Sequence, residues 1–154
     1  MNSLRSIVAV AALATYLPAQ AATTDPEVII YRVSGVVDTG GGGGTGIATA
    51  FACSNFSGVP ETVRFVVRGP TAALLANAPF TVAHLNTITV TTRAVAMYVE
   101  EILNTSLVNL GTAAIAATSV NVTCTAMQVN AEIVSPVGIA LHMTRFNPVP
   151  GTQE

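Results

Sequence analysis

Two cysteines are the residues of this chain whose type and spacing point most directly to chemistry. Cys53 and Cys124 are the only cysteines in the 154-residue sequence. Paired thiols can form a disulfide, and an even number of cysteines favours that bond in an oxidising compartment. The chain-entropy model assigns about 4 kcal/mol of stabilisation to a closed loop of this length. We therefore predict a Cys53–Cys124 disulfide, with two buried free thiols as the alternative.

The two histidines, His84 and His142, could ligate a metal or transfer protons. Together with Met97, Met127 and Met143 they supply the imidazole and thioether groups that copper prefers. His142 and Met143 are neighbours in a predicted strand, however, so their side chains point to opposite faces. The sequence also has no His-x-His pair and no methionine cluster. We therefore predict no metal site and no cofactor, and keep a copper carrier as an alternative.

The glycine run Gly40–Gly44 is followed by Thr45 and Gly46, so the segment from Gly41 to Gly46 matches the pattern G-x-G-x-x-G. A dinucleotide site needs a helix directly after the glycines, and a phosphate-binding P-loop needs a lysine. The chain has no lysine, and Ile47–Cys53 alternates as a strand does. We predict a flexible hairpin loop here and no nucleotide cofactor.

Charged side chains give no catalytic constellation either. Glu100 and Glu101 are adjacent, so they diverge on a strand or a helix and cannot form the carboxylate pair of a glycosidase. The pattern G-x-S-x-G of a nucleophile elbow is absent from the sequence. Arg64 and Arg68 share one face of a predicted strand, about 13 Å apart. They could bind an anion, but we favour their role as solubilising charges on an outer face. We predict no catalytic residue, and enzymatic activity stays an open alternative.

The first 21 residues have the layout of a secretory signal peptide. Arg5 is followed by the short apolar run Ile7–Leu17 and by the small-x-small site Ala19–Ala21. We predict a signal peptide over residues 1–21 and a single domain over residues 22–154, whose 133 residues suit one domain. The expected location is secreted or periplasmic.

The composition of the predicted mature chain excludes two kinds of partner. Beyond residue 21 it has five arginines and eight acidic residues, so its net charge is about −3. A nucleic-acid binder needs a basic surface that displaces counterions, so we predict no nucleic-acid partner. No stretch after the signal approaches the roughly 18 unbroken apolar residues of a spanning helix, so we predict no membrane span in the mature chain.

Apolar residues alternate with period two along most of the chain, which is typical of half-buried strands. Turn residues separate the runs. The predicted strands are Val28–Val37, Ile47–Cys53, Thr62–Arg68, Phe80–Val82, Thr87–Thr92, Ala113–Ala117, Val120–Thr125 and Val137–Phe146. Ala94–Leu103 fits both a helix and a strand, and we predict a strand because strands flank it. The pattern indicates an all-β fold, an immunoglobulin-like antiparallel β-sandwich of about seven to nine strands.

Each cysteine is predicted on the apolar face of its own strand. Cys53 shares its face with Phe51, and Cys124 shares its face with Val120 and Val122. Two inward-facing cysteines on distant strands predict a bridge that pins two sheets together through the core, as in immunoglobulin-like domains.

Three segments of the sequence resemble other proteins. The segments Thr49–Gly58, Val63–Arg68 and Gly138–Pro148 resemble a group of small, uncharacterised secreted bacterial proteins. The resemblance implies export and a bacterial source, and it brings no activity, cofactor or catalytic residue.

Together these features predict an exported, non-enzymatic binding or structural module of the bacterial periplasm or cell exterior, whose partner is a protein or surface that the sequence does not identify. One alternative is a small periplasmic enzyme or metal carrier that uses His84 or His142. Another is a subunit of an extracellular fibre or surface layer, with Ala22–Val28 as a detachable strand.

Overall fold

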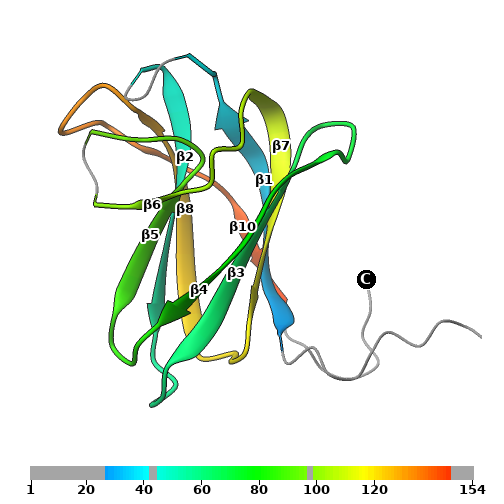
Figure 1. The fold of residues 1–154 in the computed structure, drawn as a ribbon, viewed down its shortest axis with the longest axis vertical. Coiled ribbons are helices and arrows are strands. Elements are labelled where there is room, and N and C mark those ends of the chain that lie inside the picture. Colours follow the sequence, from blue (N-terminus) through cyan, green and yellow to red (C-terminus); the bar gives the residue numbers. More distant parts are fainter. Residues whose placement is uncertain (1–26, 42–44, 97–98, 147–154) are drawn as a thin grey trace, which may run out of the picture.

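The chain folds into two packed β-sheets (Figure 1). The computed structural model describes residues 27–41, 45–96 and 99–146, so the predicted signal peptide lies outside the described residues. The strands are β1 Val28–Asp38, β2 Ile47–Asn55, β3 Glu61–Arg68, β4 Leu74–Val82, β5 Thr87–Thr91, β6 Glu101–Ile102, β7 Val108–Ala117, β8 Val122–Asn130, β9 Ile139–Ala140 and β10 Met143–Arg145.

The first sheet has the strand order β10-β1-β7-β3-β4, and the second has the order β6-β5-β2-β8-β9. All pairs are antiparallel except β5 with β6. The predicted all-β sandwich is confirmed. Within the described residues, no helix has the length and apolar character that crossing a membrane requires.

The core lies between the sheets because alternate residues of each strand face inward. On β3 the side chains of Val63, Phe65 and Val67 are fully buried, while Arg64 and Arg68 lie on the outer face, as the alternation predicts. Phe51 of β2 meets Phe65 across the core with 5.8 Å between ring centroids. Aromatic contacts of this kind join the two sheets through buried apolar area.

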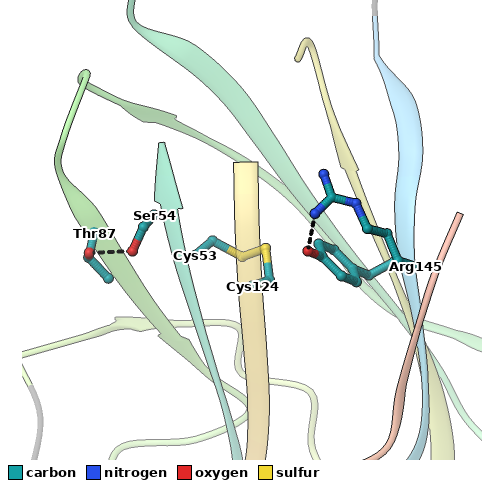
Figure 2. Close-up of a disulfide and its surroundings, with 6 residues drawn as sticks. Cys53, Ser54, Thr87, Cys124 and Arg145 are labelled. Atoms are coloured by element: carbon teal, nitrogen blue, oxygen red, sulfur yellow. Dashed lines mark hydrogen bonds between the residues drawn. A yellow bond between two sulfur atoms is a disulfide. The ribbon is translucent and has the colours of Figure 1, made fainter. Parts of the chain in front are cut away.

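The predicted disulfide is present, but its predicted position between the sheets is wrong. Cys53 on β2 lies directly opposite Cys124 on β8, and these are neighbouring strands of the second sheet (Figure 2). Their Cα atoms are 4.1 Å apart, which suits the close, non-hydrogen-bonded pairs of an antiparallel ladder. Period-two patterning shows only that each cysteine faces the core. Which strands lie side by side depends on the whole topology.

Other strand predictions also differ from the structure: β4 begins at Leu74 rather than Phe80, and β7 begins at Val108 rather than Ala113. The predicted strand Val137–Phe146 is divided: β9 pairs with β8 in the second sheet, and β10 pairs with β1 in the first. Between them Leu141 packs against the core as the chain crosses from one sheet to the other. Val137 and Ile139, two apolar residues of the predicted strand, are exposed, because this part of the segment lies at the sheet edge.

The strand predicted over Ala94–Leu103 is limited to the two residues of β6, and Met97 lies outside the described residues. The start of this segment covers the outer face of the second sheet instead. Val95 packs there, in a buried cluster separate from the main core, and the amide of Ala96 donates to the carbonyl of Ala131. The cluster is made of small apolar side chains, namely Ala48, Ala50, Val95, Val129 and Ala131. Small alanines on the outer side of β2 leave room for a covering loop, so β2 is buried on both faces.

Candidate functional site

A cleft of about 420 Å³ lies where the segment after β1, the segment after β5 and the segment before β7 meet. We call this end of the sandwich the loop end. Asp38 is the last residue of β1, and Arg93 follows β5 by two positions. Both line the cleft, together with Asn104, Ser106 and Leu107 from the segment before β7.

A buried ion pair forms the base of this site. Arg93 Nη1 lies 3.4 Å from Asp38 Oδ1, and the two side chains are only 8% and 3% exposed. Arg93 also donates from Nη1 to the carbonyl of Gly40 and from Nη2 to the carbonyl of Gly41, the latter at 2.9 Å. A charge out of contact with water is tolerated when it is both paired and hydrogen-bonded. The guanidinium therefore fixes the backbone that follows β1.

The carboxylate of Asp38 links the same backbone to the segment before β7. It accepts a hydrogen bond from the amide of Gly40 at 2.9 Å and one from the hydroxyl of Thr105 at 3.2 Å. Thr105 is 2% exposed. Three segments far apart in sequence thus meet on one Arg–Asp pair.

Two buried threonines tie the sheets together beneath the cleft. The hydroxyl of Thr49 on β2 accepts from the amide of Val37 on β1 and donates to its carbonyl. Thr92 accepts from the amide of Thr49 at 3.0 Å and also donates to the carbonyl of Val37. Buried hydroxyls need such partners, because an unsatisfied one costs about 1–3 kcal/mol. β1 and β2 belong to different sheets, so these bonds hold the sandwich closed.

The segment before β7 has an unusual backbone. Asn104 and Ser106 both adopt positive φ angles, of 52° and 60°. Non-glycine residues rarely adopt this conformation, and such residues concentrate at ligand-binding segments. Asn104 and Ser106 line the cleft with exposed side chains. They present an amide and a hydroxyl to a ligand.

The glycine run does not form the predicted hairpin, because β1 and β2 lie in different sheets and do not pair. Residues 42–44 lie outside the described residues. Gly46 has a φ of +74°, and a Cβ there would lie 2.2 Å from Thr39 Oγ1, so a larger residue would be strained and would have to displace that hydroxyl. A strand follows the glycines rather than a helix. The backbone arrangement of a dinucleotide site is therefore missing.

The two histidines lie on separate elements. Nδ1 of His84, in the turn after β4, accepts from the amide of Gly58 at 3.0 Å. His142 lies between β9 and β10 and lines a different hollow from the cleft. Met143 packs against the main core and Met127 against the outer cluster. Among the described residues, no group of three or more histidine, cysteine or acidic side chains is placed to hold a metal ion.

The remaining charged candidates have local partners. Glu100 accepts from the amide of Val95 at 2.8 Å, whereas Glu101 is exposed on β6, so they do not form a carboxylate pair. Arg64 forms an ion pair with Glu27, and Arg68 donates to a backbone carbonyl in the turn after β3. The structure therefore does not join Arg64 and Arg68 in one anion site.

Searches of protein-family models, curated proteins and solved structures found no match to this chain. The site therefore rests on its geometry. Sequence reasoning missed Arg93, Asp38 and Thr105. The sequence did contain a signal for two of them. Only 9% of the residues are charged, and Asp38 and Arg93 stand at the ends of apolar strands.

Proposed function

We propose that this protein is an exported, non-enzymatic binding module of the bacterial periplasm or cell exterior, and that its ligand binds in the cleft at the loop end. The observation that carries the proposal is the buried Arg93–Asp38 pair, which fixes the segments that line the cleft before any ligand arrives. A preorganised site loses less conformational entropy on binding.

The chemistry of the lining favours an uncharged ligand. Arg93 and Asp38 neutralise each other below the surface, so the exposed part of the cleft offers the amide of Asn104, the hydroxyl of Ser106 and the apolar side chain of Leu107. These groups bind through hydrogen bonds and apolar contact. The volume of about 420 Å³ is within the range of small-molecule sites. We infer a neutral, hydrogen-bonding ligand such as a sugar or a short peptide.

The disulfide supports the exported part of the proposal. Disulfides form and persist in oxidising compartments outside the cytoplasm. Intact-mass measurement of the protein exported from a bacterial host tests this part. A chain that begins at Ala22 and is two hydrogens lighter than its reduced form is expected. A full-length chain with two free thiols would contradict export.

The arrangement of the sheet edges favours a binding module over a fibre subunit. Three of the four sheet edges in the described fold are the short strands β6, β9 and β10, and the long edge strand β4 contains Pro79. Short edges and proline both hinder strand addition. Glu27, at the described end of the predicted detachable strand, pairs with Arg64. Val28, the last residue of that predicted strand, is the first residue of β1, and residues 22–26 lie outside the described residues.

A ligand screen tests the proposed site. NMR spectra of the 15N-labelled protein should respond to neutral sugars or short peptides at Asn104–Leu107 and at Gly40. The variant Leu107→Ser should weaken a hit, whereas Leu74→Ser, which changes a similarly exposed leucine on β4, should leave it unchanged. Hits that perturb only other surfaces would overturn the proposal. Turnover of a substrate that is lost in His84→Ala or Glu100→Gln would support the enzyme alternative instead.

A further inference from the structure

A second hollow, of about 210 Å³, lies on the outer face of the first sheet. It lies over β10, β1 and β7. Arg32 is opposite Thr144 on β10, and Ser34 is opposite Thr112 on β7. These residues alternate with buried core residues, so their side chains share the outer face. His142, which directly precedes β10, completes the lining.

We propose that this hollow binds a tetrahedral oxyanion, phosphate or sulfate, between the Arg32 guanidinium, the His142 imidazole and the surrounding hydroxyl groups. The side chains in the lining are one guanidinium, one imidazole, three hydroxyls and two small apolar groups, with no carboxylate among them. Guanidinium and hydroxyl donors are the groups that proteins use to bind phosphate. This site is independent of the cleft at the loop end.

The guanidinium of Arg32 also contacts an aromatic ring. Its guanidinium carbon lies 5.2 Å from the centre of the Phe146 ring. The electron-rich face of the ring attracts the cation, and this contact uses none of the guanidinium N–H donors. Among the described residues, Arg32 has no carboxylate partner of the kind that Arg64 and Arg93 have.

The charge distribution supports an anionic ligand on this face. Arg32, Arg64 and Arg68 all belong to the outer side of the first sheet. Glu27 forms an ion pair there with Arg64. The other described acidic residues lie in the cleft, at the start of β3, or on the second sheet and its loops. They are Asp38, Glu61, Glu100, Glu101 and Glu132. A positive face on a chain of net charge −2 attracts anions to that face.

Titration with sodium phosphate and sodium sulfate, at constant ionic strength, tests the site. NMR shifts are expected at Arg32–Ser34, Thr112 and His142. Arg32→Gln should weaken binding about tenfold, because it removes a charged hydrogen-bond donor. Arg68→Gln removes the same charge from the same face outside the hollow and should change the affinity less than about twofold. Thr112→Val should weaken binding without changing the charge.

Two results would overturn the proposal. One is the absence of localised NMR shifts. The other is an equal loss of affinity in Arg32→Gln and Arg68→Gln, which would mean diffuse electrostatic attraction.

A second experiment uses vesicles of phosphatidylglycerol to distinguish free phosphate from a lipid headgroup as the ligand. Vesicle binding that inorganic phosphate displaces and Arg32→Gln weakens would identify the headgroup as the source. If inorganic phosphate binds in the hollow and the vesicles do not bind, the ligand is the free ion. Vesicle binding that inorganic phosphate does not displace and Arg32→Gln does not weaken would count against the hollow as the binding site.

Discussion

The two ends of the sandwich are fastened by different chemistry. At the loop end, hydroxyls of Thr49 and Thr92 bind Val37 across the sheets, and a buried ion pair organises the loops above them. At the other end, the side-chain amide of Asn55 on β2 donates to the carbonyl of Val82 on β4, also across the sheets. The disulfide lies near that end of β2.

This difference is the reason why we propose the loop end, and not the disulfide end, as the binding site. The disulfide end is fixed by a covalent bond and a neutral amide, which need only hold the strands. The loop end instead uses buried charges, whose directional bonds set the backbone of three separate segments around a cleft. Buried ion pairs are weak contributors to net stability, and in some proteins they specify one arrangement instead. The following predictions test this contrast, from the largest expected effect to the smallest.

Breaking the buried ion pair should have the largest effect. Arg93→Met leaves the carboxylate of Asp38 buried without its cation, which should lower the free energy of unfolding by about 3–5 kcal/mol. Urea denaturation followed by circular dichroism measures the loss. The control is Arg64→Met, since the Arg64–Glu27 pair is more exposed and should cost about 1 kcal/mol. Equal losses in the two variants would show that the Arg93 pair has no special role.

Removal of the disulfide should cause the second-largest loss of stability. The double variant Cys53→Ala/Cys124→Ala should lose about 2–4 kcal/mol, mainly because the unfolded chain regains freedom. Native-state hydrogen exchange should show this loss as faster global unfolding. The exchange rates of the cleft amides of Gly40 and Thr105 should rise no more than those of the core amides. Selective opening of the cleft would contradict the division of roles between the two ends.

Truncation of the buried amide should have a moderate effect. Asn55 is fully buried and donates to the carbonyls of Val59 and Val82 while accepting from the amide of Ser57. Asn55→Ala leaves these groups unsatisfied, which should cost about 1–3 kcal/mol in urea denaturation. Asn109→Ala, at an exposed position of β7, is the control and should be neutral. A neutral Asn55→Ala would mean that the amide does not fasten this end.

The smallest effect should be the difference in stability between two glycine-to-alanine variants. Gly46 and Gly58 both adopt positive φ, but only Gly46 lacks room for a Cβ. Each alanine variant should lose about 1–2 kcal/mol from backbone strain. Gly46→Ala should lose about 1 kcal/mol more, because the Cβ displaces the Thr39 hydroxyl that accepts from the amide of Ile47. Thermal unfolding of the two variants checks the difference, and identical values would indicate that the backbone at Gly46 relaxes freely.

The fold was predictable from the sequence to the extent that local periodicity governs it. The alternation around Phe65 identified the buried face of β3, and Ile47–Cys53 identified most of β2. The prediction was wrong for Val137–Phe146, because a continuous alternation does not reveal that one strand pairs with two sheets in turn. It was also wrong for Ala94–Leu103, where apolar residues cover the outside of a sheet.

The candidate sites were much less predictable. Asp38 and Arg93 are 55 residues apart, and Arg32 and His142 are further apart still. No local spacing marks such pairs, because they meet only after the strands have assembled.

Local patterning is enough to establish that this chain forms strands, which side of most strands faces the core, and that its two cysteines face inward. These are properties of a pleated backbone, in which side chains alternate whatever the neighbouring strand is. Only the tertiary structure decided that Cys53 and Cys124 lie side by side in one sheet, and that Arg93 is buried while Arg32 lines an open hollow. Strand order and burial come from the packing of the whole chain, which minimises exposed apolar surface and unpaired buried charge together.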